Sequence, residues 1–259
     1  MCLILFAHDC HPDYALVVAA NRDEFHRRRT RALARWPDLP VIGGRDAQAG
    51  GTWMGIHAER RSRIAMVTNV RNGRPQGSGP RSRGALPVDF LVGKQDPEAV
   101  ARSLVADAAH YQPVNLLVAD LGGPSGGDLW WATNVPEPLA RWVAPGVHGL
   151  SNGALDNDWP KVTDGAAAFA EIVSGDDGTG VEPYLALLRD ETRPDPARLP
   201  ATGVPAAYEE AFSPLFVNMP GYGTRASTVL RVRRDGHGDI TERRFAWRGR
   251  QRGTTTIRW

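Results

Sequence analysis

The amino-acid sequence predicts an α+β fold, a sandwich with sheets inside and helices outside. Predicted elements follow the order strands, helices, strands, helices, strands, so both groups of strands are needed to bury the helices. The run from Leu3 to Ala7 is apolar at every position, which is typical of a strand in the middle of such a sandwich, covered on both faces. Of the 259 residues, 42% are hydrophobic, which is enough for a substantial core. We therefore expect a single domain over residues 1–259.

The chain begins with a predicted β-hairpin. Two apolar runs, over 1–7 and 14–20, flank a turn that contains Pro and Asp. If residues 11–13 form the loop, paired positions in the two strands sum to about 24. This register sets Cys2 opposite Arg22.

The remaining elements follow from local signals. A helix that begins at Pro97 has Asp96 as its expected N-cap, and Asp158 is the expected cap of an Ala-rich helix that begins at Pro160. An Asp-Gly turn at 235–236 predicts a C-terminal hairpin. The expected strands cover 41–46, 53–56, 64–70, 114–120, 129–134, 142–143, 147–150, 224–234 and 240–247, and the expected helices cover 86–92, 97–108, 160–173 and 182–188.

Two basic segments are expected to be irregular. Residues 71–84 carry four arginines, no acid and many Gly, Pro and Ser residues, which predicts a flexible loop. This loop is either a plain surface loop or a lid whose arginines grip an anionic ligand. After Glu242 the chain has six arginines and no acid, so residues 248–259 are predicted to be a basic C-terminal tail, disordered or lying on the surface.

Composition excludes several classes of protein. The formal net charge is only +2, from 31 basic and 29 acidic residues, so we expect no nucleic-acid partner. The basic residues are nearly all Arg, with only Lys94 and Lys161 as lysines. Two cysteines provide no disulfide framework, and no apolar run is long enough for a signal peptide or an integral membrane segment. The expected location is the cytoplasm.

The predicted hairpin brings reactive groups together. Cys2 is a potential nucleophile at the start of one strand, and the partner strand ends in Asn21-Arg22-Asp23-Glu24. Arg22 would favour the thiolate of Cys2, and an α-amino group freed by removal of the initiator methionine would serve as its base. We expect the two carboxylates to form a salt bridge within the motif.

The chain contains several spaced motifs besides the hairpin. Together with Cys2 and Asn21–Glu24 they are Gly43–Asp46, Gly51–Gly55, Ser82–Gly84, Gly149–Asn152, Trp159–Val162 and Tyr222–Arg225. This set resembles the transport and Golgi organisation protein family, which is also named for its Asn-Arg-Asp-Glu motif. That family is similar to N-terminal-nucleophile hydrolases, which implies an αββα four-layer sandwich. Its eukaryotic members are implicated in moving haem out of haem-rich compartments, with links to lipid and acyl-coenzyme A metabolism, and the resemblance implies haem handling here.

The similarity to hydrolases also implies roles for individual residues. In cysteine-type relatives the nucleophile matches Cys2, and an arginine and an aspartate at the end of the second strand match Arg22 and Asp23. A later asparagine that supports the oxyanion matches Asn152, and an arginine on a late strand matches Arg225. Here Arg22 and Asp23 are adjacent, so their side chains point to opposite faces of a strand. We therefore expect Asn21 and Asp23 on one face, with Arg22 and Glu24 on the other.

Ligand-binding residues follow from the same motifs. For haem, candidate ligands are His8, Cys10 and His11 in the first turn, although the chain has no Cys-x-x-Cys-His attachment signature. No zinc site or nucleotide cofactor is indicated, because there is neither a spaced Cys/His cluster nor a phosphate-binding glycine motif. The predicted ligand-binding residues are Asn21, Arg22, Asp23, Glu24, Arg45, Trp53, Arg83, Asn152 and Arg225.

Three classes of function stay open at this point. The first, which the family resemblance favours, is a haem-binding or haem-trafficking protein on a hydrolase-like scaffold. The second is a cysteine amidase or acyltransferase that uses Cys2 on a small amide or thioester. The third is a lipid or acyl-coenzyme A binding protein whose phosphate contacts come from the arginines of the 71–84 loop: Arg71, Arg74, Arg81 and Arg83.

Overall fold

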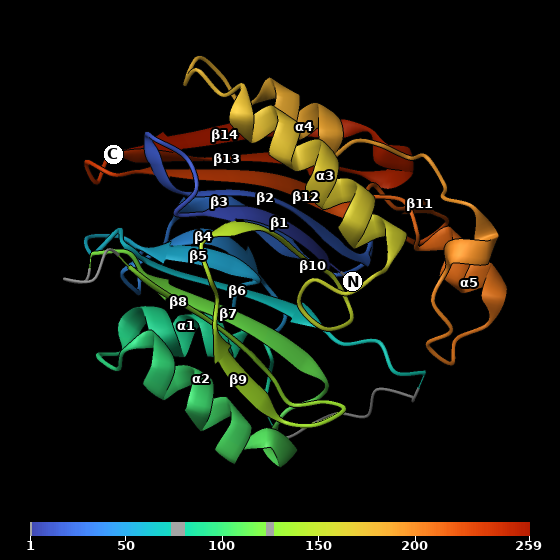
Figure 1. The fold of residues 1–259 in the computed structure, drawn as a ribbon, viewed down its shortest axis with the longest axis horizontal. Coiled ribbons are helices and arrows are strands. Elements are labelled where there is room, and N and C mark those ends of the chain that lie inside the picture. The colour runs from blue at the N-terminus through green and yellow to red at the C-terminus, as the bar shows by residue number, and fades with distance from the viewer. Residues whose placement is uncertain (1, 74–80, 123–126) are drawn as a thin grey trace. The chain divides into compact units, whose positions relative to one another are not determined.

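The computed structural model describes residues 2–73, 81–122 and 127–259 (Figure 1). These residues form two seven-stranded sheets and five α-helices, so each of two compact units contains a sheet layer and helices of its own. This arrangement confirms the predicted α+β class. The prediction of one domain over 1–259 stays a prediction, because compactness does not establish independent folding. The first unit consists of Met1–Arg27, Arg71–Arg74 and Pro145–Trp259, and the second of Arg28–Val70 and Pro75–Ala144.

The sheet of the first unit is antiparallel in every pairing. Its strand order is β10-β1-β2-β12-β13-β14, and the short strand β11 also pairs with β12. The strands are β1 (Cys2–His8), β2 (Tyr14–Phe25), β10 (Gly146–Leu150), β11 (Asn218–Met219), β12 (Tyr222–Arg233), β13 (Gly238–Phe245) and β14 (Gln251–Arg258).

The first hairpin has the predicted register. Cys2 pairs with Arg22 and Leu3 with Asn21, so the two positions of each pair sum to the expected value. Every residue of β1 after Cys2 is buried, and β1 lies between β10 and β2 rather than at the edge. The prediction of an interior strand is therefore confirmed.

Helices α3 (Pro160–Ser174) and α4 (Glu182–Leu187) pack on one face of this sheet (Figure 1). Phe169 of α3 and Tyr184 of α4 are buried against Leu5 of β1 in one apolar cluster. The predicted cap at Asp158 is wrong, since α3 begins directly after Trp159, whose side chain makes no capping hydrogen bond. Pro at the first helical position has no N–H group, which reduces the number of donors that need a cap.

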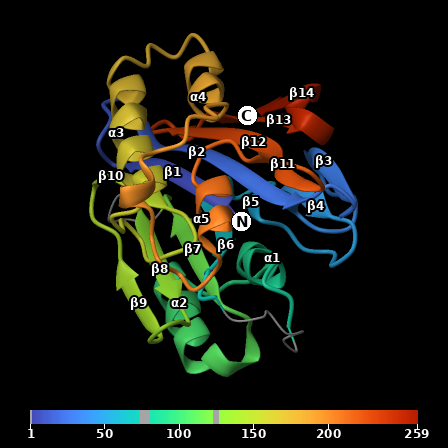
Figure 2. The same ribbon diagram turned by 90° about the vertical axis from the view of Figure 1, so that its right-hand side faces the viewer.

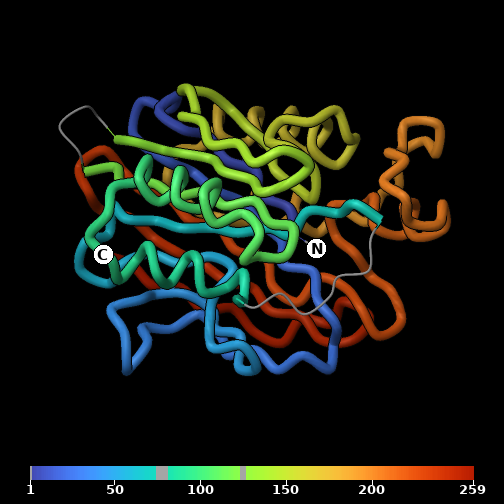
Figure 3. The backbone as a smooth tube through the Cα atoms, turned by 90° about the horizontal axis from the view of Figure 1, so that it is seen from below, coloured from blue at the N-terminus to red at the C-terminus, as the bar shows by residue number. Residues whose placement is uncertain are grey.

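The chain between α4 and β12 is an excursion that carries η2 (Pro196–Arg198) and α5 (Ala206–Ala211). In Figure 3 this segment, drawn in orange, projects beyond the strands of its own unit. The Pro-rich composition of 192–220 is typical of such an excursion.

The predicted C-terminal tail is wrong. A short turn with η3 (Trp247–Gly249) is followed by β14, which forms the edge of the sheet. β14 pairs with β13 from Asp239, opposite Arg258, to Phe245, opposite Gln251. Three consecutive threonines, 254–256, lie in this strand, and the Thr241 and Thr256 hydroxyls lie 2.9 Å apart across the pair. Thr and Ile favour strands, and charged residues are common on sheet edges, so the arginine content did not indicate disorder.

The second unit has strand order β3-β4-β5-β6-β7-β8-β9, also antiparallel. Helices α1 and α2 pack on one face of this sheet (Figure 2), where Phe90 and Leu104 join its apolar core. Asp96 caps α2 as predicted and accepts from Ala99 N at 2.7 Å. The elements are β3 (Thr30–Arg35), β4 (Val41–Asp46), β5 (Met54–His57), β6 (Arg63–Asn69), α1 (Ala85–Val92), α2 (Pro97–Ala106), η1 (Ala108–His110), β7 (Val114–Asp120), β8 (Asp128–Thr133) and β9 (Leu139–Trp142).

The arginine-rich segment 71–84 is only partly described, since residues 74–80 lie outside the described residues. At its C-terminal end, Arg81 Nη2 donates to Asp89 Oδ2 at 3.1 Å. Arg83 Nη1 donates to the Pro113 carbonyl at 3.2 Å. These two arginines therefore contact the second unit, of which they are part.

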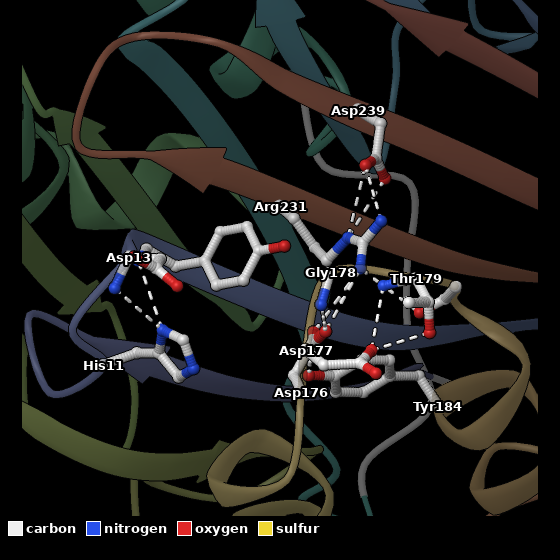
Figure 4. A network of polar contacts seen from close by, with 11 residues as sticks. His11, Asp13, Asp176, Asp177, Gly178, Thr179, Tyr184, Arg231 and Asp239 are labelled. Atoms are coloured by element: carbon white, nitrogen blue, oxygen red, sulfur yellow. Dashed lines mark hydrogen bonds and ion pairs between the residues drawn. The ribbon is translucent and has the colours of Figure 1, made fainter.

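A buried cation joins β12, β13 and the end of α3 in the first unit (Figure 4). Arg231 Nη2 donates to Asp239 Oδ2 at 2.8 Å, and Nη1 donates to Asp176 Oδ1 at 3.3 Å. The Tyr184 hydroxyl donates to the other oxygen of Asp176 at 2.7 Å. Only 7% of the Arg231 side chain and 3% of the Asp176 side chain are exposed.

Removing this cation leaves two carboxylates without a counter-charge. We expect Arg231→Ala to lower the free energy of unfolding by about 3–5 kcal/mol, the usual cost of breaking a buried ion pair from one side. Arg193, which pairs with Glu210 at the surface with 58% of its side chain exposed, provides the control. Arg193→Ala should cost about 0–1 kcal/mol. Denaturant unfolding measures both, and equal losses for the two variants would contradict a stabilising role for the buried network.

Candidate functional site

Three predicted site residues form a row across neighbouring strands of the first unit. Cys2 pairs with Arg22 of β2 on one side. On the other side Leu150, the last residue of β10, pairs with Ile4, and Asn152 follows two residues beyond this strand end. The Ser151 hydroxyl donates to the Cys2 carbonyl at 3.0 Å, which holds the two strand ends together. The row Asn152, Cys2, Arg22 is the centre of the candidate site.

The Cys2 thiol is a weak acid at this position. Burial raises its pKa, and the charge of Asp23 raises it further. The Arg22 charge and a hydrogen bond from the Asp23 backbone lower it, but they do not outweigh burial. The Arg22 charge therefore lowers the pKa of Cys2, as predicted. Because the net pKa shift is upward, the resting thiol is protonated at neutral pH.

The Asn-Arg-Asp-Glu motif is divided between the two faces of β2, as expected. Asn21 points toward the helix layer, where its Nδ2 donates to the Leu188 carbonyl at 2.7 Å and to the Leu215 carbonyl at 2.9 Å. On the opposite face Arg22 Nη2 lies 3.5 Å from Glu24 Oε2, which is the expected salt bridge within the motif. Asn21 thus ties β2 to the layer above it, while Arg22 shares the face of Cys2.

Asp23 lies on the helix face with a buried lysine. Its Oδ1 accepts from the Thr224 hydroxyl at 2.7 Å, and its Oδ2 lies 3.8 Å from Lys161 Nζ. The Asp23 side chain is fully buried and only 6% of the Lys161 side chain is exposed. Among the described residues Asp23 is the carboxylate that pairs with Lys161, and at 3.8 Å the contact is an ion pair longer than a hydrogen bond.

Lys161 is a buried charged residue of the candidate site that the sequence prediction did not include. Burial lowers the pKa of Lys161, and the Arg71 charge lowers it further. The charges of Asp23 and Cys2 act in the opposite direction and raise it. Lys161 is thus within electrostatic reach of the thiol. Two signals could have found it: it is one of two lysines against 29 arginines, and it belongs to the Trp159–Val162 motif.

Arg71 and Tyr222 border the same group of residues. The Arg71 guanidinium lies 3.1 Å from Glu209 and 4.8 Å from the centre of the Trp159 ring, and its side chain is 10% exposed. Its backbone N–H donates to the Asn152 carbonyl at 2.7 Å. Tyr222 donates from its hydroxyl to the Asp23 carbonyl, and burial raises the pKa of Tyr222 well above its ordinary value. Arg71, predicted as part of a lid, is instead fixed within the first unit.

Arg225, predicted as a catalytic residue, occupies the bulge of β12 between Thr224 and Ala226. Its Nη1 donates to the Phe25 carbonyl at 3.0 Å and to the His26 carbonyl at 3.1 Å. Arg225 therefore holds the end of β2.

Three predicted ligand-binding residues belong to the second unit. Arg45 forms a bidentate ion pair with Asp38: Nη1 donates to Oδ1 at 2.7 Å and Nη2 to Oδ2 at 2.9 Å. Its guanidinium also stacks over the Trp36 ring, 4.1 Å from the ring centre. Trp53 packs against the apolar core of the same unit. Arg83 donates to a backbone carbonyl there, as described above.

The three candidate haem ligands differ in their surroundings. His8 is buried in β1, whereas Cys10 is exposed. His11 Nδ1 accepts from the backbone N–H groups of Asp13 and Tyr14, at 3.0 and 3.3 Å, which closes the first turn. Cys10 and His11 help to line a cavity of about 540 Å³ that is also lined by residues of α3.

Within the described ranges no three His, Cys, Asp or Glu side chains converge as a metal site. No helix in the same ranges is long and apolar enough to cross a membrane.

The proximity of Lys161 to Cys2 predicts how the thiol titrates. A nearby cation favours the thiolate, so Lys161→Met should raise the pKa of Cys2 further. In a Cys10→Ala background, where Cys2 is the only cysteine, the alkylation rate rises with pH as the thiolate forms. We expect the midpoint of this profile to move to higher pH in Lys161→Met and to stay in place in Lys161→Arg.

The other lysine provides the matched control for this experiment. Lys94 is exposed and belongs to the second unit, so Lys94→Met should leave the profile unchanged. Equal midpoints in Lys161→Met and Lys94→Met would show that Lys161 does not influence Cys2.

Comparisons with known proteins agree with the motifs. The family model described as Transport and Golgi organisation 2 matches residues 1–246. The Transport and Golgi organization protein 2 homolog of Bos taurus is 34% identical over 274 aligned positions, which cover 100% of this chain and 96% of the relative. The Homo sapiens homolog is 32% identical, covering 94% of this chain and 92% of the relative.

A solved structure is also similar at low sequence identity. It is the Caenorhabditis elegans N-acylethanolamine-hydrolyzing acid amidase ortholog, with 12% identity and a TM-score of 0.39 over 82% of this chain and 98% of that chain. The family assignment rests on the sequence matches, which extend along almost the whole chain. The chain belongs to the Transport and Golgi organisation 2 family.

Proposed function

We propose that this protein is a cysteine-dependent acyl hydrolase or acyltransferase, with Cys2 as the nucleophile and a small amide or thioester as the substrate. The observation that carries the proposal is the row Asn152, Cys2, Arg22, with the buried Asp23 and Lys161 beside it. A thiol next to an amide donor, two cations and a strand terminus has the parts that acyl transfer needs.

In the proposed reaction, removal of Met1 frees the α-amino group of Cys2. The thiol proton passes to this amine while sulfur attacks the carbonyl carbon, so a C–S bond forms and the carbonyl oxygen becomes an oxyanion. Asn152 would donate to that oxyanion, and the Ser151 hydroxyl, 3.4 Å from Asn152 Oδ1, orients the amide for this role.

Collapse of the oxyanion breaks the C–N bond of an amide or the C–S bond of a thioester. The ammonium returns its proton to the leaving group, which departs as an amine or a thiol. Water, or an acceptor amine or alcohol, then attacks the thioester on Cys2 with the α-amine again accepting a proton. The acyl product leaves and the thiol is restored.

Local charges would make the thiolate accessible during attack. Burial keeps the resting thiol protonated, because it raises the pKa of Cys2. Arg22 and Lys161 contribute two positive charges, which Glu24 at 3.5 Å and Asp23 at 3.8 Å partly balance. These two positive charges would favour a developing thiolate.

Intact mass and covalent labelling test this proposal. We expect purified protein to lack Met1 and to gain one acyl group when treated with an electrophilic lactone or activated amide. Cys2→Ala should abolish the adduct, and Cys10→Ala, which removes the exposed cysteine, should retain it. Retained Met1 together with the absence of acylation at Cys2 would contradict a nucleophilic role.

Haem binding, which the sequence predicted as the first function, is our second candidate. The observation that favours it is the cavity of about 540 Å³ beside Cys10 and His11, two of the candidate axial ligands. Binding of an acyl-coenzyme A by the 71–84 loop stays a prediction, since Arg71 is paired with Glu209 and Arg81 with Asp89.

Haem titration tests this second candidate. We expect a saturable Soret shift that weakens by roughly tenfold when both Cys10→Ala and His11→Asn are present, since each ligand contributes about 1 kcal/mol or more. Asn keeps a side-chain acceptor for the turn that His11 closes and removes the imidazole. His237→Asn, at a histidine that is 73% exposed in another turn, is the control. No saturable change in the wild-type protein at micromolar haem would contradict a carrier function.

A further inference from the structure

The turn between β13 and β14 displays three arginines and an exposed aromatic ring. Trp247 is 60% exposed, and Arg248, Arg250 and Arg252 are also at the surface. Within the described part of the chain, none of these three guanidinium groups forms an ion pair or a side-chain hydrogen bond. Other arginines of the same unit do have carboxylate partners: Arg22, Arg71, Arg189, Arg193, Arg198, Arg231, Arg233, Arg234, Arg243 and Arg244.

The backbone of this turn is fixed. Ala246 N donates to the Arg250 carbonyl at 2.8 Å and closes the turn. Arg248 has φ of 56° and ψ of 34°, the left-handed conformation, which is unfavourable for a residue with a side chain. Gly249 follows in the same region, and an added Cβ there would lie 2.6 Å from the Arg189 guanidinium. The arginine side chains therefore extend from a turn closed by a backbone hydrogen bond.

A depression of about 350 Å³ lies at the turn, lined by Ala246, Trp247, Arg248, Arg250 and Arg252. Three of its five lining residues carry a positive charge, and none carries a negative one. Arg189, which donates to the Gly249 carbonyl, is paired with Glu191. The depression thus combines positive charge, an apolar ring and no internal counter-ion.

Like charges extend the positive region. Burial lowers the pKa of Arg225, and the neighbouring charges of Arg22 and Arg252 lower it further. Arg252 is therefore close enough to another guanidinium for the two to repel. An anion bound at the turn would relieve this repulsion as well as pair with the three arginines.

We propose that this depression binds a phosphate group, with Arg248, Arg250 and Arg252 contacting its oxygens and the Trp247 ring packing against the apolar or planar part of the ligand. Guanidinium groups bind phosphate oxygens through paired N–H donors, and a phosphate offers several oxygens to more than one arginine at once. The phosphate belongs either to a soluble phosphate ester or to the headgroup of a phospholipid. This site is separate from Cys2, and the proposal does not depend on the proposed acyl transfer.

Binding experiments on the full chain test the proposal with two probes. Glycerol 3-phosphate is titrated by calorimetry, and co-sedimentation measures binding to vesicles of phosphatidylcholine, with or without phosphatidic acid. The site variant combines Arg248→Asn, Arg250→Gln and Arg252→Gln, with Asn chosen because it tolerates the left-handed conformation. We expect it to bind the phosphate probe roughly tenfold more weakly or worse, since each charge-assisted hydrogen bond is worth more than 1 kcal/mol.

A control variant removes the same charge elsewhere. It combines Arg102→Gln, Arg193→Gln and Arg198→Gln, at exposed arginines that already have carboxylate partners. It should bind as the wild type does, and Trp247→Ala should weaken binding of a ligand with an apolar part. Binding of glycerol 3-phosphate supports a soluble ligand, and binding only to vesicles with phosphatidic acid supports a lipid headgroup. Absence of binding by the wild type, or equal loss in both triple variants, overturns the proposal.

Discussion

The pairing of β2 with β1 and β12 is the constraint on which the candidate site depends. Because side chains alternate along a strand, this pairing sends Asn21 and Asp23 toward the helices and Arg22 toward the face of Cys2. A shift of one residue would exchange the two sets and separate Cys2 from Arg22. The hydrogen bonds from Asn21 to Leu188 and Leu215 resist such a shift, because losing them would leave buried carbonyl groups without donors.

The residues of the Asn-Arg-Asp-Glu motif therefore have different structural roles. Asn21 fastens the strand to the helix layer, and Asp23 provides a buried negative charge that makes Lys161 tolerable there. Arg22 is the member placed to influence the thiol directly. The cation that Asp23 contacts comes from a helix far away in sequence.

The fold and the site were predictable to different extents. Local signals sufficed for the first hairpin, because an apolar run of fixed length and a short turn determine which residues pair. They sufficed for α2 because Asp96 and Pro97 act within one helical turn. Local signals failed at Asp158, because α3 begins at Pro160 without a side-chain cap. They also failed at β14, because the high arginine content suggested a tail although the threonines of this segment favour a strand.

Contacts between distant segments are not encoded by local signals. Lys161 joins Asp23 through the packing of α3 on the sheet, and no pattern within either segment indicates that contact. Arg45, Trp53 and Arg83 belong to neighbouring motifs of the chain, and the contacts described for them lie within the second unit. Their predicted role in ligand binding stays a prediction.

The protonation state of Cys2 connects this packing to reactivity. Burial makes the thiol a weaker acid than in water, so little thiolate exists at rest, and a protonated thiol resists both oxidation and premature alkylation. In the proposed acyl transfer, an α-amino group with a pKa of about 8 would accept the proton at moderate cost as attack on a carbonyl begins. The thiolate would then form only as its charge passes to the substrate, with Arg22 at the paired position of the neighbouring strand. The proposed reactivity of Cys2 would therefore depend on freeing the amine.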